Sequence, residues 1–286
     1  MRILILGGDG MLGHQLLKTL DQHTTYVTLR QELSCYQSFK IFTKENSFPS
    51  IDIRRFDDLI DVFNVFKPQA VINAIGIVKQ RSDAKQSIPS LEINALFPHR
   101  LANLCSMINA RMIHISTDCV FSGEKGQYTE DDPMDARDLY GQSKFLGEVH
   151  DNHCVTLRSS IIGLELSRKT SLIEWFLAQK GSISGYRRAI YTGITTAEMS
   201  RLIENILLNH SELSGLWHVA STPINKFDLL KMLAEKLPKN DVIIQPDDQF
   251  FCDRSLIGTR LQEAINYIPP TWHDMLTELA NEITNR

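Results

Sequence analysis

The chain has 286 residues, of which 43% are hydrophobic, and its formal net charge is −4. This length and apolar content suffice for one large domain or two small ones with a real core. The charge balance is weakly acidic and contains no long run of Lys or Arg. We therefore expect neither nucleic acid nor an anionic membrane as a partner.

The first expected elements are a strand and a helix joined by glycines. The apolar run Ile3–Leu6 ends at Gly7, and Gly10 and Gly13 follow at three-residue spacing. A helical pattern runs over Met11–Leu20. Such a turn lets backbone N–H groups approach a pyrophosphate. On spacing alone, an ordinary strand-to-helix turn is the alternative. The residues expected to contact a dinucleotide here are Gly7, Gly10, Met11, Leu12 and Gly13.

Short apolar runs then alternate with amphipathic stretches. This alternation predicts an α/β fold, a Rossmann-type doubly wound parallel sheet with helices on both faces. The expected strands are Tyr26–Leu29, Ala70–Ile75, Met112–Ile115 and Val155–Leu157. The expected helices are Asp57–Phe66, Leu91–Ile108 and one that starts near Leu139. The polar stretch 31–50 is expected to be an irregular loop, and the stretch 121–138 to be a lid or rim.

The second half of the chain predicts a smaller, partly interwoven C-terminal lobe. Its expected helices are Ser171–Gln179, Thr196–Leu208 and Lys226–Leu237, and its short strands are Ala189–Tyr191 and Leu216–Val219. We expect a cofactor domain over 1–160, to which the chain returns at about 193–222. The substrate lobe would span 161–286, mainly 161–192 and 223–286. The stretch 181–186 is one place where the chain is expected to cross between lobes.

Tyr140 and Lys144 stand four residues apart, which brings both side chains to one face of a helix. A phenol has an ordinary pKa of about 10, and a nearby ammonium favours the phenolate. The pair therefore suits proton transfer to the oxygen of a ketone that is being reduced. A surface Tyr and a solvated Lys would give the same spacing. The position favours the first interpretation, because the helix follows Thr117 at the end of a predicted strand, where open parallel sheets bind ligands.

Arg30 closes the second predicted strand, at the place where an acidic residue would take a ribose 2′-hydroxyl. A cation there suits a 2′-phosphate, so NADPH is favoured and NADH is the second choice. A solvated arginine at the end of a strand is the alternative, since Glu32 lies just beyond it.

The five cysteines are odd in number and widely spaced, and no C-x-x-C pair occurs. This pattern indicates neither a disulfide framework nor a zinc site, and we expect no metal. The apolar run before the first glycine is too short for a signal peptide, and no apolar stretch is long enough to span a bilayer. We expect a cytoplasmic protein.

Six segments together resemble the extended short-chain dehydrogenase/reductases, and most of all the dTDP-4-dehydrorhamnose reductase branch. The segments are GGDGMLG at 7–13, NAIG at 73–76, NA at 94–95, STDCVFSG at 116–123, LYGQSK at 139–144 and GE at 147–148. The resemblance covers nearly the whole chain. It implies NADPH-dependent reduction of the 4-keto group of a nucleotide-activated 6-deoxyhexose. The product would serve a surface polysaccharide, and a homodimer is one expected assembly.

The resemblance also implies roles for individual residues. Thr117 would hydrogen-bond the substrate carbonyl, Tyr140 would be the acid, and Lys144 would tune Tyr140 and hold the nicotinamide ribose. Further cofactor contacts would be Asp52, Ile53, Asn73, Ala74, Gly76 and Asn94. Candidate contacts to the nucleotide-diphosphate sugar are Asp118, Cys119, Lys79, Arg254 and Arg260.

The sequence departs from the branch at the sugar pocket. Cys119 stands where the rhamnose enzyme has Tyr, and the segment 158–163 lacks the usual aromatic residue. The identity of the sugar therefore stays open, and a 2-acetamido analogue of 4-ketorhamnose is one alternative. A second alternative is a bifunctional epimerase and reductase that uses Cys119. A third is a non-catalytic nucleotide-binding regulatory subunit, against which the combination of Thr117, Tyr140 and Lys144 argues.

Overall fold

The computed structural model describes residues 1–78, 85–239 and 241–286, and its contacts divide the chain into two compact units. Unit 1 contains Met1–Ser116, Asp138–Leu157 and Ser200–Leu216. Unit 2 contains Thr117–Arg137, Arg158–Met199 and Trp217–Arg286. The segment 117–137 thus groups with unit 2, although it was expected in the domain 1–160. Compactness assigns neither a cofactor nor a substrate to either unit, so the functional partition stays a prediction.

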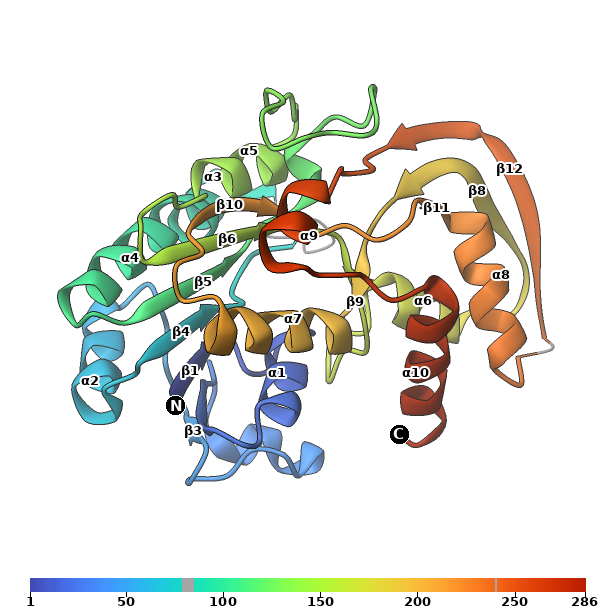
Figure 1. Cartoon of the computed structure of the whole chain (residues 1–286). Helices are drawn as coiled ribbons and strands as arrows, with labels where there is room; N and C mark the ends of the chain where they lie inside the picture. The colour runs from blue at the N-terminus through green and yellow to red at the C-terminus, as the bar shows by residue number, and fades with distance from the viewer. Residues whose placement is uncertain (79–84, 240) are drawn as a thin grey trace. The chain divides into compact units, whose positions relative to one another are not determined.

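The main sheet has seven strands among the described residues, in the order β10-β6-β5-β4-β1-β2-β3 (Figure 1). Its strands are β1 Arg2–Leu6, β2 Thr24–Thr28, β3 Ser47–Phe48, β4 Ala70–Asn73, β5 Arg111–Ile115, β6 Cys154–Arg158 and β10 Gly215–His218. Neighbours from β3 through to β6 pair in parallel. The predicted doubly wound parallel sheet is confirmed. Its strand order reverses between β1 and β4, the kind of switch point at which such folds bind ligands.

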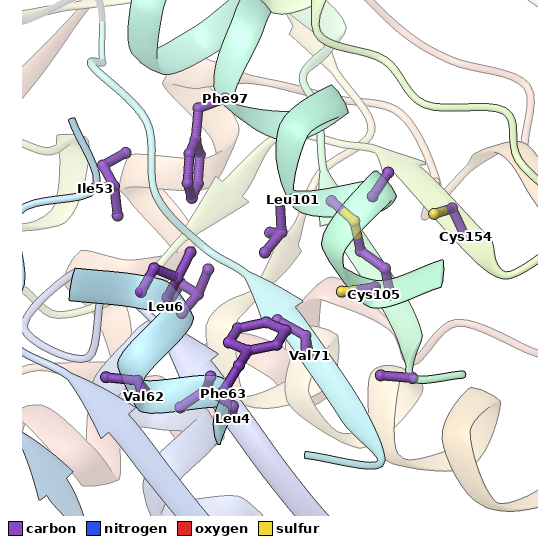
Figure 2. Packing of buried hydrophobic residues seen from close by; sticks show 14 of the residues in the cluster. Leu4, Leu6, Ile53, Val62, Phe63, Val71, Phe97, Leu101, Cys105 and Cys154 are labelled. Carbon is purple, nitrogen blue, oxygen red and sulfur yellow. The ribbon is translucent and has the colours of Figure 1, made fainter. Parts of the chain in front are cut away.

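Helices cover both faces of this sheet. They are α1 Gly13–Thr19, α2 Phe56–Phe66, α3 Ser87–Ser90, α4 Phe97–Met107, α5 Leu139–Leu146 and α7 Thr196–Asn209. Leu4 and Leu6 point toward α2 and α4, where Phe63 and Leu101 complete one buried cluster (Figure 2). Ile5 alternates with them and points to the other face, where α1 packs on β1 and β2. Each of these side chains contributes about 1.5–3 kcal/mol through its burial.

Two stretches of unit 1 differ from the sequence prediction. Residues 31–50, expected to be irregular, contain the 3-10 helix η1 (Leu33–Phe39) and the edge strand β3. The reason is aromatic packing, because the buried Tyr36 ring meets Phe42 edge-on at 5.6 Å between centroids. The helix expected over 91–108 begins as the π-helix η3 (Leu91–Leu96) and continues as α4.

Unit 2 has its own small sheet, in the order β11-β8-β12. Its elements are η4 Asp118–Val120, β7 Ile161–Ile162, α6 Leu172–Ala178, β8 Gly181–Tyr191, β9 Ile194–Thr195, β11 Ile224–Asn225, α8 Lys226–Lys236, β12 Val242–Asp253, α9 Thr259–Ile265 and α10 Trp272–Thr284. The stretch 181–186, expected to be a crossing between lobes, is instead the first half of β8. Gly185 is needed there because α8 packs on this strand, and a Cβ would lie 2.8 Å from Phe227 Cδ2. No helix among the described residues is long and apolar enough to cross a membrane.

Candidate active site

The glycine turn lies at the carboxyl end of β1, beside the switch point. Gly7 has a φ of +86°, and a Cβ on Gly13 would lie 2.0 Å from Gly7 O, so neither position tolerates a side chain. Gly10 N donates to Gly7 O at 3.1 Å, and the buried His14 donates from Nδ1 to Gly10 O at 2.8 Å. The backbone is therefore bare and held in place where a pyrophosphate would approach, and the turn fits a dinucleotide.

A tyrosine from the unexpected helix η1 holds this turn. Tyr36 donates its hydroxyl to Asp9 Oδ2 at 3.2 Å and accepts a hydrogen bond from Gln31 N at 3.3 Å. Burial, followed by the charge of Asp9, raises the pKa of Tyr36 to about 12. The hydroxyl thus stays protonated and links the glycine turn to the end of β2. Sequence reasoning missed this contact, because no local motif connects residues 27 positions apart.

Arg30 follows β2 and is exposed, as a cofactor contact at this place would be. Arg54 donates from Nε to both carboxylate oxygens of Asp52, at 3.0 and 3.1 Å. These bonds, with a smaller effect of the Arg30 charge, lower the pKa of Asp52 to about 2. The neighbouring Ile53 side chain lies in the hydrophobic cluster of Figure 2. The cofactor roles of Arg30, Asp52 and Ile53 stay predictions.

The end of β4 is fixed by two buried asparagines. Asn73 accepts from Ile75 N at 3.2 Å through Oδ1, and its Nδ2 donates to His114 Nδ1 at 3.1 Å. Asn94, on η3, accepts from Ile77 N at 2.8 Å and donates to Ile77 O at 3.1 Å. These bonds shape the segment of Asn73, Ala74 and Gly76 that the resemblance places beside the nucleotide.

Asn94 also reaches the helix that carries the predicted acid. Its Nδ2 donates to Ser143 Oγ on α5 at 3.2 Å. The π-helical turn is consistent with this double use of one amide, because π-turns occur preferentially at functional sites. The close crossing needs Gly147, where a Cβ would lie 1.9 Å from Asn94 O.

Tyr140 and Lys144 lie one turn apart on α5, as predicted, and Asp138 caps the helix by accepting from Gly141 N at 2.8 Å. Lys144 is 5% exposed, and its Nζ donates to Ile115 O at 2.6 Å. Burial lowers the pKa of Lys144 to about 8, with the charge of Glu148 acting in the opposite direction. The group therefore remains largely an ammonium at neutral pH.

The structure brings Lys144 together with part of the predicted cofactor site. A Cβ on Gly76 would lie 3.5 Å from Asn94 Oδ1 and 4.0 Å from Lys144 Nζ. These three residues come from the end of β4, from η3 and from α5, and they meet at the carboxyl edge of the sheet. A buried ammonium at this edge is what the predicted reduction chemistry requires.

The predicted substrate residues begin unit 2. Thr117 accepts a hydrogen bond from Cys119 N at 3.1 Å and donates its hydroxyl to Asp118 Oδ1 at 3.1 Å. Ser160 donates to the other oxygen, Asp118 Oδ2, at 2.5 Å. Asp118 is thus a buried carboxylate with two hydroxyl donors. Sequence reasoning noted the segment that holds Ser160 but not its contact with Asp118.

Cys119 is not suited to act as a base at neutral pH. Burial, followed by the charge of Asp118, raises the pKa of its thiol to about 12. Arg254 Nη1 lies 3.8 Å from the sulfur, and this cation only partly offsets the shift. The thiol is therefore protonated, which weighs against Cys119 as the base of an epimerisation.

The remaining candidate cations serve contacts within unit 2. Arg254 donates from Nε to Phe121 O at 2.9 Å, and so fastens the segment after Thr117. Arg260 forms an ion pair with Asp131 and lies 3.8 Å from Glu130. Their diphosphate roles stay predictions, and Lys79 lies outside the described residues.

One cluster among the described residues has the composition of a metal site. Asp151, His153 and Cys154 offer ligand atoms within 4.8 Å of one another. His153 Nε2 donates to Ala102 O at 2.9 Å, and burial raises the pKa of the Cys154 thiol to about 12. These contacts place the three groups but assign no metal to them.

The extended short-chain dehydrogenase/reductases combine a dinucleotide-type switch point with a Tyr-x-x-x-Lys helix at the carboxyl edge of the sheet. This chain is one of them and is similar to the dTDP-4-dehydrorhamnose reductases. Residues 1–162 match the family model described as RmlD substrate binding domain, and the chain belongs to that family.

Comparisons with single proteins agree with this family. The chain is 24% identical to a dTDP-4-dehydrorhamnose reductase of Aggregatibacter actinomycetemcomitans, over 97% of this chain and 98% of that protein. It is 27% identical to methionine adenosyltransferase 2 subunit beta of Mus musculus, over 51% of this chain and 41% of that protein. A dTDP-4-dehydrorhamnose reductase of Bacillus anthracis, solved in complex with NADP, superposes with a TM-score of 0.79 at 21% identity, over 98% of this chain and 99% of that one, and so shares the fold.

Proposed function

We propose that the chain is an NADPH-dependent oxidoreductase that reduces the 4-keto group of a nucleotide-activated 6-deoxyhexose, in the formation of sugars for a surface polysaccharide. NADH is the alternative cofactor, and cytoplasmic location and a homodimer are parts of the proposal. The observation that carries it is the ammonium of Lys144, buried beside Gly76 and Asn94, one helical turn from Tyr140. Burying a charge is costly, and proton transfer to a ketone explains why it is kept.

The residues of unit 1 have distinct tasks in this reaction. Gly7 and Gly13 admit the pyrophosphate, and Asn94 holds the segment beside the nucleotide. The reduced nicotinamide, when bound, supplies the hydride that the carbonyl carbon accepts. Tyr140 donates its proton to the carbonyl oxygen as negative charge develops there. Lys144 then stabilises the phenolate that remains.

The substrate side of the proposal depends on unit 2. Thr117 is to donate its hydroxyl to the same carbonyl oxygen, and Asp118 and Cys119 are to border the sugar. That Thr117 and Tyr140 act on one oxygen stays a prediction. The identity of the sugar stays open at Cys119, because a thiol cannot supply the stacking wall of an aromatic ring.

The test is reduction of a panel of 4-keto sugar nucleotides, followed by the absorbance of the reduced nicotinamide. Tyr140→Phe should lower kcat by at least ~10²-fold with NADPH binding unchanged, as expected for the loss of a positioned acid. Tyr26→Phe, in the aromatic cluster at β2, is the matched control and should keep full turnover. Wild-type protein that binds NADPH but reduces no ketone would favour the regulatory-subunit alternative.

A further inference from the structure

A buried phenol in unit 2 has no hydrogen-bond partner among the described residues. Tyr191, the last residue of β8, is 7% exposed, and its hydroxyl is closed to solvent. Its ring packs against Trp272 with centroids 5.6 Å apart. Buried hydroxyls in native proteins are nearly always paired, because an unpaired one carries an uncompensated desolvation cost. This exception therefore requires an explanation.

Tyr191 borders the residue that binds the carboxylate of Asp118. A Cβ on Gly193 would be 2.9 Å from Tyr191 Cε2 and also 2.9 Å from Ser160 Cβ, so an edge of the Tyr191 ring and Ser160 both line this glycine. Ser160 in turn donates to Asp118 Oδ2 at 2.5 Å. Burial, followed by the charge of Asp118, raises the pKa of Tyr191. The phenol is thus a neutral donor within electrostatic reach of a carboxylate.

The Thr117 hydroxyl has one proton and two uses for it. In the structure it donates that proton to Asp118 Oδ1 at 3.1 Å. In the proposed reaction it must donate the same proton to the substrate carbonyl, and a hydroxyl cannot do both. When Thr117 turns to the substrate, Asp118 loses one of its two described hydroxyl donors. Hydrogen bonds to a buried charged group are strong, so this loss would oppose substrate binding.

We propose that Tyr191 is a positioning residue that replaces this bond: when the Thr117 hydroxyl turns to the substrate carbonyl, the Tyr191 hydroxyl donates to Asp118. Because the hydroxyl is closed to solvent, Tyr191 acts through Asp118 and not by touching the substrate. The inference rests on the proposed function and adds to it the reason why Thr117 can give up its hydrogen bond to Asp118.

The test is Tyr191→Phe, which keeps the ring against Trp272 and removes only the hydroxyl. Without substrate, the unfolding temperature should stay equal or rise, because an unpaired buried group is gone. With NADPH and a 4-keto sugar nucleotide, kcat/KM should fall about tenfold, the loss of one hydrogen bond to a charged group, with NADPH binding unchanged. This opposition between stability and activity is not expected of a merely structural tyrosine.

A double-variant comparison checks that Tyr191 acts through Thr117. In a Thr117→Val background, Tyr191→Phe should cost nothing further, because the donor exchange no longer exists. The control is Tyr267→Phe, which removes a hydroxyl that donates to Glu198 Oε1 at 2.9 Å. It should lower the unfolding temperature and leave kcat/KM unchanged.

Three results would overturn the inference. They are a lower unfolding temperature for Tyr191→Phe, an unchanged kcat/KM, and a tenfold loss that persists with Thr117→Val. A wild-type chain that reduces no ketone refutes the proposed function itself. An active wild type with an unaffected Tyr191→Phe variant refutes only the role of Tyr191.

Discussion

Lys144→Met should change how the free energy of unfolding depends on pH. Burial lowers the pKa of Lys144 from 10.5 to about 8 in the folded chain. Between these two values the unfolded chain binds more protons than the folded chain, so the wild type gains stability as the pH rises through this window. Relative to a variant without the amine, the gain is roughly 2 kcal/mol between about pH 7 and about pH 9.5.

The assay is urea unfolding of wild type and Lys144→Met at both pH values. All other titrating groups are shared, so their contributions cancel in the difference between the two free energies. Lys18→Met, at an exposed position of α1, is the matched control, and its difference from wild type should not depend on pH. A Lys144→Met difference that is constant with pH, or that moves against the wild type as pH rises, would refute the reasoning that burial sets the pKa.

Three further predictions concern the turn, the cofactor and the thiol. Gly13→Ala should destabilise the fold by about 2 kcal/mol or more and weaken NADPH binding, because its Cβ would meet Gly7 O at 2.0 Å. Gly10→Ala, whose Cβ would lie 3.2 Å from Gly7 O, should be less destabilising. Equal losses of unfolding free energy in urea for the two variants would contradict this prediction. Arg30→Ala should raise the Kd for NADPH much more than that for NADH, and equal losses would remove the 2′-phosphate assignment. Cys119→Ser should retain turnover, and the product that the wild type forms in deuterated water should carry no deuterium at C3 or C5. Deuterium at these carbons that is lost in the variant would instead establish epimerisation.

The sheet and its switch point could be predicted from the sequence because their signals are local. The run Ile3–Leu6 is buried throughout, and the glycine spacing marks the turn that follows. The four-residue spacing of Tyr140 and Lys144 likewise places both on one helix. What these patterns could not show is the surroundings of each side chain, such as the carbonyl of Ile115 that Lys144 contacts.

Contacts between distant segments escaped prediction for a physical reason. Tyr36 reaches Asp9 from a stretch that reads as polar, because three aromatic rings spaced along it form a small core of their own. Tyr191 occupies an ordinary strand position, and only the fold shows that its hydroxyl is buried without a described partner. Propensity and periodicity report on which face a residue lies, whereas hydrogen-bond partners depend on tertiary packing.

The place of β10 at the end of the main sheet has a consequence during protein synthesis. β10 is the neighbour of β6, yet α6, β8, β9 and α7 all lie between them along the chain. A ribosome needs about 3–11 seconds to make that intervening stretch at 5–20 residues per second. Throughout this time the nascent chain carries an open strand edge at Cys154–Arg158, whose side chains are all buried in the finished protein. Such an edge is a template for aggregation, so chaperone protection would matter most before Gly215 has left the ribosome.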